Sequence, residues 1–330
     1  MKTMILLIVV VVITIAWVNR PLTPPTGNYN QHHLSLKNTN DYRCDNLQLY
    51  PVYASSAFIQ YYKNLGPYLS MEEALAQEKM LITEYNSNEG TNLPPTPTRI
   101  NRQQLPIDDA RVNTLFVENI SADTIIILGG ELIRGGKQDR MIAQDFMLPP
   151  HSGKIDVGVY CVEHGRWSAP NEDVKFKEAM PMAPNKVRKA GSKERNQQKV
   201  WEEVEDISAM MDLKITTGAL AHAMNSEEFN KVLQKYADCY KTGWPDEVVG
   251  VVAVMGDEIV GCDLFASPTL FNKYFPSLLK SYTGNAASAA KEIKLNYMDV
   301  DQYLKGLLDE TQQEALINEK GTQLVNGKYK

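Results

Sequence analysis

Apolar and polar residues alternate in short runs over the first half of the chain, which is the pattern of half-buried β-strands. The predicted strands lie at 47–52, 81–85 and 112–118, followed by three more from Thr124 onward. Glycine- and proline-containing turns at 135–136 and 149–153 separate the last three. Short strands with turn residues between them indicate an antiparallel sheet of the sandwich or barrel type.

Helical periodicity dominates the second half, where apolar residues recur on single stripes. Polar caps mark helix starts in both halves of the chain: Ser70 and Glu73 form a capping box in the first half, and Ser267 with Pro268 starts a helix in the second. Two apolar strands flank Gly256–Asp257 and form a hairpin. The predicted elements after the glycine-rich strands are helices at 196–211, 226–240, 267–282 and 301–317 and hairpin strands at 248–255 and 258–265.

These patterns predict an α+β fold in one domain spanning residues 44–285. A β-rich half (44–167) packs against a helix-rich half (196–285) that carries the hairpin, and we expect the two halves to share one core because the hairpin is too apolar to stand alone. Residues 168–195 read as a polar connection, and 286–330 as a polar helical tail.

The first residues form a targeting element. Lys2 precedes an apolar run at 4–18 that is shorter than a mature membrane helix, so we expect a signal peptide or short anchor over residues 1–18. A flexible spacer, rich in proline, asparagine and threonine, follows at 19–43. The chain is therefore expected to be exported (periplasmic, secreted or anchored), with membrane contact through this segment alone.

Composition narrows the function classes. The net charge of −6 disfavours nucleic-acid binding, and the basic residues between 186 and 195 read as an exposed loop. A phosphate-binding P-loop, a dinucleotide fingerprint and a serine-hydrolase elbow are all lacking, and the five histidines lack ligand spacing, so neither cofactor nor metal is expected. The four cysteines allow three pairings, while the patterns around Cys239 and Cys262 favour small buried side chains.

Two glycine pairs and one strand end concentrate the polar chemistry. The segment 129–140 reads GGELIRGGKQDR, and 160–167 reads YCVEHGRW. Glycine lets backbone approach a neighbour closely, and ionisable groups crowd around both pairs. A structural role alone does not require so many ionisable groups, so the segment indicates a site.

These two motifs closely resemble the signature of the ARG and rhodanese-phosphatase-superfamily-associated protein domain family, with G-E-E-L-x-G-A-K-Q-N-R and V-S-C-V-E-Q-G-R-W as its pattern. The resemblance covers most of residues 44–285. Gly130, Asp139 and His164 stand where the family has Glu, Asn and Gln, so one of two adjacent carboxylates is missing. The family's association with ADP-ribosylglycohydrolases and rhodanese-like phosphatases implies ADP-ribose or nucleotide chemistry.

The leading hypothesis is a binding site for a small anionic molecule, such as a nucleotide or an ADP-ribose-like compound. In this hypothesis Arg140 and Arg166 bind the anionic group, Gln138 orients the ligand and Trp167 stacks on it. An equally weighted alternative pairs Arg140 internally with Glu131 or Glu163. The full set of candidate binding residues is Gly135, Gly136, Lys137, Gln138, Arg140, Arg166, Trp167, Gln198 and Trp201.

Two rival hypotheses remain. In the first, the protein is a hydrolase acting on such a ligand, with Glu131 or Glu163 as the general base. This requires a carboxylate with a raised pKa and an open pocket. In the second, the motif is architectural and the protein is an envelope-associated interaction protein. A reactive Cys161 is less favoured than a structural one, because His164 would face away from it on a strand.

Overall fold

The computed structural model describes residues 8–9, 32–39, 41–84, 113–163, 165, 176–210, 219–241, 243–286, 292–309, 324–325 and 328–329. The fold is mixed α+β, as predicted. The chain divides into two compact units: Met1–Leu65 with Lys231–Lys330 (unit 1), and Gly66–Asn230 (unit 2). This division differs from the predicted boundary between residues 167 and 196, because the first strands of the chain pair with the late hairpin.

Unit 1 is built on one six-stranded sheet in which β4 (Leu47–Ala54) is central. The predicted hairpin is confirmed as β14 (Val248–Met255) and β15 (Glu258–Leu264), and β14 pairs antiparallel with β4. The remaining strands are β1 (Ile8–Val9) on β15, and β2 (Leu34–Leu36) and β3 (Arg43–Cys44) on β4. A separate two-stranded sheet joins β16 (Leu324–Val325) and β17 (Lys328–Tyr329).

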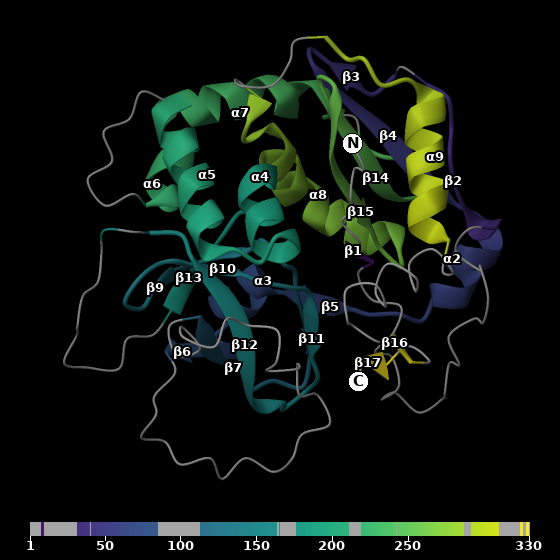
Figure 1. Cartoon of the computed structure of the whole chain (residues 1–330). Coiled ribbons are helices and arrows are strands. Elements are labelled where there is room, and N and C mark those ends of the chain that lie inside the picture. Colours follow the sequence, from purple (N-terminus) through teal and green to yellow (C-terminus); the bar gives the residue numbers. More distant parts are fainter. Residues whose placement is uncertain are drawn as a thin grey trace. The chain divides into compact units, whose positions relative to one another are not determined.

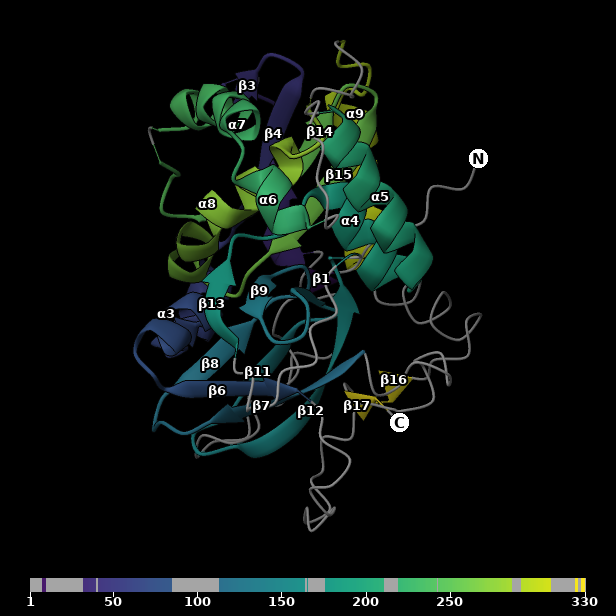
Figure 2. The ribbon, with the colours of Figure 1, turned by 90° about the vertical axis from the view of Figure 1, so that its left-hand side faces the viewer.

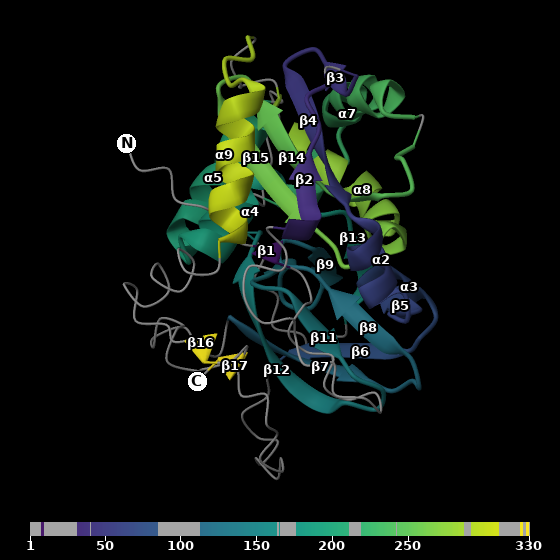
Figure 3. The same ribbon diagram turned by 90° about the vertical axis from the view of Figure 1, so that its right-hand side faces the viewer.

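Helices cover both faces of the unit 1 sheet, in which the inner strand β14 is apolar and buried at every position. Cys262 and Leu264 pack in one cluster with α2 (Ser56–Tyr62) and α9 (Tyr297–Leu308). On the opposite face, Gly261 lies under the Tyr282 ring of α8 (Pro268–Thr283), and the Tyr282 hydroxyl donates a hydrogen bond to buried Asp263. Figures 1 and 3 show α8 and α9 on opposite sides of β14 and β15.

A disulfide joins Cys44, at the end of β3, to Cys239, at the end of α7 (Glu227–Cys239), across 195 residues of sequence. The interpretation of Cys239 as a small buried side chain is therefore wrong, whereas Cys262 is buried and free. Nearby, the Tyr236 hydroxyl donates to Asn46 Oδ1 at 2.6 Å, and Lys235 pairs with Asp45 at 2.5 Å. Three different kinds of bond thus fix this part of α7 to the β3–β4 turn.

Unit 2 contains a six-stranded sheet in the order β13-β9-β10-β12-β7-β6 and a three-stranded sheet in the order β11-β8-β5. Figure 2 shows strands of both sheets, with β6, β7 and β12 of the large sheet and β8 and β11 of the small sheet labelled. The large sheet is formed by β6 (Met80–Glu84), β7 (Thr114–Asn119), β9 (Leu132–Gly135), β10 (Arg140–Ile142), β12 (Gly153–Cys161) and β13 (Phe176–Met180). The small sheet is formed by β5 (Tyr68–Ser70), β8 (Thr124–Ile127) and β11 (Phe146–Leu148). Five strands thus replace the three predicted after Thr124. Turns at Gly129–Gly130 and near Asp145 split the apolar runs, and the Asp145 carboxylate accepts a hydrogen bond from the Gly129 N–H at 2.6 Å.

Alternation along the strands assigns their side chains to two cores. Leu132, Met141 and Tyr160 belong to a cluster with helices, whereas Ile133, Ile142 and Val159 belong to a cluster shared with the small sheet. The helices of unit 2 are α3 (Met71–Ala76), α4 (Asn185–Arg188), the π-helix η3 (Lys189–Lys193), α5 (Gln197–Met210) and α6 (Leu220–Met224). The capping box predicted at Ser70 and Glu73 is confirmed at the start of α3.

The prediction of an exposed basic loop at 186–195 is wrong in part, because α4 and η3 occupy most of it and Arg188 is buried. A Cβ atom at Gly130 would lie 2.5 Å from Cγ of Arg188. The positive φ of Gly130 (+98°) and its missing side chain therefore make room for this arginine. Likewise, the polar connection predicted at 168–195 contains strand β13.

No helix among the described residues is long and apolar enough to cross a membrane. Apart from Ile8–Val9, the predicted targeting segment at 1–18 lies outside the described residues, as does much of the 19–43 spacer and of the helix predicted at 301–317 beyond Asp309. The part of that helix that is described lies in α9, which begins earlier, at an Asn296–Asp299 capping box.

The disulfide makes a testable contribution to stability. Reduction of the native protein should lower its free energy of unfolding by about 2–5 kcal/mol, because the cross-link restricts the unfolded chain. Hydrogen exchange should quicken at the C-terminal end of α7. The Cys44→Ala/Cys239→Ala variant is the control, since it should already be destabilised and insensitive to reductant. An unchanged melting temperature of the native protein on reduction would contradict this role.

Candidate functional site

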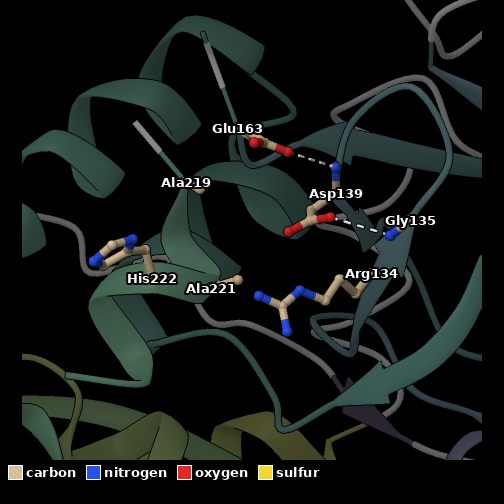
Figure 4. A pocket seen from close by; sticks show the side chains of 7 residues that line it. All are labelled: Arg134, Gly135, Asp139, Glu163, Ala219, Ala221 and His222. Atoms are coloured by element: carbon tan, nitrogen blue, oxygen red, sulfur yellow. Dashed lines mark hydrogen bonds between the residues drawn. The ribbon is translucent and has the colours of Figure 1, made fainter. Parts of the chain in front are cut away.

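A hollow of about 320 Å³ opens on unit 2 beside the second glycine pair. The residues that line it come from β9, from the turn before β10, from the segment after β12 and from α6; they are Arg134, Gly135, Asp139, Glu163, Ala219, Ala221 and His222. Figure 4 shows the Asp139 carboxylate and the Arg134 guanidinium directed toward the same space, with the His222 ring turned away. Two of the predicted residues, Gly135 and Glu163, therefore lie at this hollow.

Two buried carboxylates are held at the hollow by the backbone of the glycine turn. Asp139 Oδ1 accepts a hydrogen bond from the Gly135 N–H at 3.1 Å, and Glu163 Oε2 accepts one from the Asp139 N–H at 3.3 Å. Both side chains are 4% exposed. A single bridge between Glu163 and Ala219 adds α6 to the same arrangement. The turn thus orients the Asp139 carboxylate through the Gly135 amide and the Glu163 carboxylate through the Asp139 amide.

Arg134 supplies the positive charge at the rim. Its side chain is 47% exposed, and its Nη1 lies 3.5 Å from Oε2 of Glu178 on β13, whose side chain is 59% exposed. Such a pair contributes little to stability because water screens both charges. Arg134 can therefore leave Glu178 and bind an external anion at a small cost in free energy.

Arg140 lies elsewhere, sealed in the interior with no exposed surface. Its Nη1 donates to Gln138 Oε1 at 3.2 Å and to the Asp139 carbonyl at 3.4 Å, and its Nη2 lies 3.8 Å from Glu84 Oε1. Within the described part of the chain, Nε and Nη2 have no hydrogen-bond acceptor. The internal pairing considered for Arg140 is therefore present, but with Glu84 in place of Glu131 or Glu163.

Glu84 is one of the residues that the sequence analysis did not identify. Met80, Ile82 and Glu84 lie on one face of β6, and the first two are buried, whereas Leu81 is 37% exposed. The prediction used the opposite face, that of Leu81 and Thr83. The sequence did carry a signal: Glu84 stands at the next alternate position after the apolar residues Met80 and Ile82. A carboxylate on the buried face of a strand indicates a charge that needs a partner inside the protein.

The same carboxylate fixes the glycine turn. Glu84 Oε1 accepts a hydrogen bond from the Lys137 N–H at 2.7 Å. Gly136 has φ +60°, and a Cβ there would lie 2.2 Å from Cζ of Phe176 and 2.7 Å from Glu84 Oε1. Glycine is therefore required at this position by both conformation and space. Lys137 and Gly136 serve the turn and do not line the hollow.

Glu131 is buried apart from the hollow, with Oε2 accepting a hydrogen bond from the Leu128 N–H at 2.7 Å. Burial raises the pKa of Glu131 to about 8, and the Leu128 N–H opposes the rise. Asp145 and Glu72 raise this pKa further, and Arg188 lowers it. The raised pKa that a general base requires thus falls on a carboxylate that the hollow does not reach.

The helix residues predicted to close over the site lie differently. Gln198 is exposed and donates to Glu202 Oε1 at 3.4 Å, and Trp201 is half-buried. Neither lines the hollow. The preceding residue, Gln197, instead accepts from the Cys161 N–H and donates to the Cys161 carbonyl, both at 2.9 Å, so it extends the edge of β12. Arg166 and Trp167 lie outside the described residues.

In the described part of the chain, no group of three or more histidine, cysteine, aspartate or glutamate side chains is placed to hold a metal ion. Arg134, Asp139 and His222 line the hollow but were not among the predicted site residues. Arg134 and Asp139 belong to the glycine-rich motif itself, whereas nothing in the local sequence marks His222.

The comparison with known families agrees with the resemblance drawn from the motifs. The model of ARPP-1, the ARG and rhodanese-phosphatase-superfamily-associated protein domain, matches residues 35–327. The match includes both units and most of the tail. No curated protein and no solved structure matches the chain.

Arg140→Ala should lower the free energy of unfolding by about 3–5 kcal/mol, because it leaves the inward carboxylate of Glu84 without its cation. Arg134→Ala, on the neighbouring strand, is the matched control and should change stability by less than about 0.5 kcal/mol, since its side chain is exposed. Denaturant titration measures both. Equal small losses would show that Arg140 has no architectural role.

Glu131 should make the protein less stable as pH rises. Its carboxyl stays protonated in the folded state up to about pH 8, whereas in the unfolded state it ionises near its ordinary value of 4.5. Between these values the unfolded state loses the proton first, so stability falls by up to about 1.4 kcal/mol per pH unit. Glu131→Gln should remove this slope in denaturant titrations from pH 5 to 8.

Glu178→Gln is the control for that slope, because it removes an exposed carboxylate from the same unit. Its profile should parallel that of the native protein. If Glu131→Gln also parallels the native profile, burial does not hold the Glu131 carboxyl in its neutral form.

Proposed function

The chain belongs to the ARG and rhodanese-phosphatase-superfamily-associated protein domain family, and we propose that unit 2 binds a small ligand carrying hydroxyl groups beside an anionic group. Sugar phosphates, nucleotides and ADP-ribose-like compounds have this chemistry. One observation carries the proposal: two buried carboxylates and an exposed arginine share a single hollow of about 320 Å³. That volume is at the small end of ligand pockets and suits a sugar-phosphate-sized group.

The carboxylates suit the hydroxyl groups. A carboxylate only accepts hydrogen bonds, and a sugar diol offers two neighbouring O–H donors. Amides of the glycine turn orient the carboxylates of Asp139 and Glu163, and both residues line the hollow. Small side chains at Ala219 and Ala221 leave the opposite wall open for a ring.

Arg134 suits the anionic group. The amides of Gly135 and Lys137 already donate to Asp139 and Glu84, so the glycine turn is committed to its own carboxylates. Arg140 is sealed in the interior. Arg134, and not Arg140 as expected from the sequence, is therefore the residue proposed to bind the anionic group. Its guanidinium can bind a phosphate or carboxylate in a bidentate manner.

Hydrolysis of such a ligand is a second candidate function, favoured by the position of Glu163 at the hollow. In this reaction Glu163 would take a proton from an attacking water. Glu131 is not proposed as the base, because it does not line the hollow. Turnover that Glu163→Gln abolishes, with ligand affinity retained, would distinguish hydrolysis from binding alone.

Export also remains a proposal, supported by two independent features. The apolar run at 4–18 follows Lys2, and Cys44 and Cys239 form a disulfide. Disulfides persist in oxidising compartments and are rare in the cytosol of mesophiles. An exported protein would meet its ligand outside the reducing interior of the cell.

Calorimetric titration of the full chain with ADP-ribose, AMP and ribose 5-phosphate tests the binding site. Arg134→Gln should weaken binding by about tenfold or more, because a charge-assisted hydrogen bond is lost. Glu178→Gln is the matched control: it breaks the same surface pair but keeps Arg134, so affinity should hold or rise. Equal losses in both variants, or no binding of any of the three compounds to the native protein, would refute the proposal.

A further inference from the structure

Unit 1 contains a second hollow, of about 400 Å³, that the function proposed for unit 2 does not use. It lies between the start of β4, strand β3 and the first residues of α9. The lining residues that decide its chemistry are Arg43, Gln48, Tyr50, Asn296, Tyr297 and Met298. All of them belong to unit 1, so the hollow is complete within one unit.

A buried amide forms part of its lining. Gln48 is 2% exposed, and its side chain makes one hydrogen bond within the described part of the chain, from Nε2 to the Leu49 carbonyl at 3.1 Å. The Gln48 oxygen thus receives no donor from the described residues. This oxygen is not one of the fully buried polar atoms that lack a partner, so it is reached from the hollow and can accept a hydrogen bond from an N–H or O–H group of a ligand.

The charge of the lining is positive. Among the described residues that line the hollow, Arg43 carries a full positive charge and none is acidic. At the N-terminus of α9, the Asn296 side-chain oxygen accepts from the Met298 and Asp299 N–H groups, so these amides are capped within the helix. The nearby carboxylate of Asp299 is committed to the capping box, where it accepts from the Asn296 N–H at 2.9 Å. Arg43 therefore favours an anionic group at its end of the hollow.

Two aromatic rings and one exposed apolar side chain complete the walls. Tyr50 is buried and Tyr297 is half-buried, with its hydroxyl donating to the Leu36 carbonyl at 3.4 Å. Met298 is 68% exposed, the most exposed of the large hydrophobic residues in the described part of the chain. Methionine adapts its shape to planar partners, and tyrosine rings stack on them.

We propose that this hollow is a binding site for a small aromatic acid that also carries a hydrogen-bond donor. The carboxylate of the ligand pairs with Arg43, its ring lies against Tyr50 and Tyr297, and its donor reaches the Gln48 oxygen. The lining of this hollow has the opposite charge balance to that of unit 2, where two carboxylates accompany one arginine. The two hollows therefore select different ligands.

Three probe molecules test the contact with Arg43 and the contact with the Gln48 oxygen separately, without any change to the protein. They are 4-hydroxybenzoate, its neutral analogue 4-hydroxybenzamide and benzoate, which lacks the hydroxyl donor. Dissociation constants from saturation-transfer NMR on the full chain should be lowest for 4-hydroxybenzoate. Loss of the charge or of the donor should each weaken binding, the charge by about tenfold.

Arg43→Gln should abolish the preference for 4-hydroxybenzoate over the amide, and Arg43 is exposed, so folding should be kept. Lys294→Gln is the matched control: it removes a cation next to lining residues, yet Lys294 pairs with Asp257 at 3.7 Å and does not line the hollow. Arg134→Gln in unit 2 should leave this binding unchanged. The proposal is overturned if the native protein binds none of the probes, or if Lys294→Gln acts as strongly as Arg43→Gln.

Discussion

The ion pair between the buried Arg140 guanidinium and the half-buried Glu84 carboxylate is the constraint on which the candidate site of unit 2 depends. A guanidinium with no exposed surface must be matched by an inward carboxylate, and β6 supplies it at its last residue. The same carboxylate oxygen accepts the Lys137 amide and so fixes the glycine turn. That turn then orients Asp139 and, through the Asp139 amide, Glu163. The hollow consequently lies beside a turn that one ion pair and three hydrogen bonds from backbone amides to carboxylates hold in place.

This arrangement separates two properties that a catalytic carboxylate would combine. Glu131 has the raised pKa but lies away from the hollow, whereas Glu163 lies at the hollow and is tied to the turn. Burial that is complete enough to shift a pKa by this much also removes access to a ligand. The geometry therefore favours recognition of hydroxyl and anionic groups over acid–base chemistry at Glu131.

Much of the fold could be predicted from local pattern. The hairpin at β14 and β15, the capping box of α3, and helices α5, α7 and α8 follow from features within a few residues of one another. The extra strands after Thr124 and the helix α4 could not, because their apolar residues are few and their partners are distant. Of the candidate site, the motif supplied Gly135 and Glu163. The motif did not reveal that Arg140 points inward, because which face of a strand is buried depends on the strands and helices that pack against it.

By itself, the sequence determined the class of the fold, the family and the segment that carries the polar chemistry, because caps, turns and periodicity are local and the motif is contiguous. Only the tertiary structure decided which charges meet. Glu84 reaches Arg140 from a separate strand, Cys44 meets Cys239 across 195 residues, and His222 comes to the hollow on a short helix. The reason is physical: a charge pair, a disulfide or a pocket is set by distance in space, and strand pairing between remote segments fixes that distance.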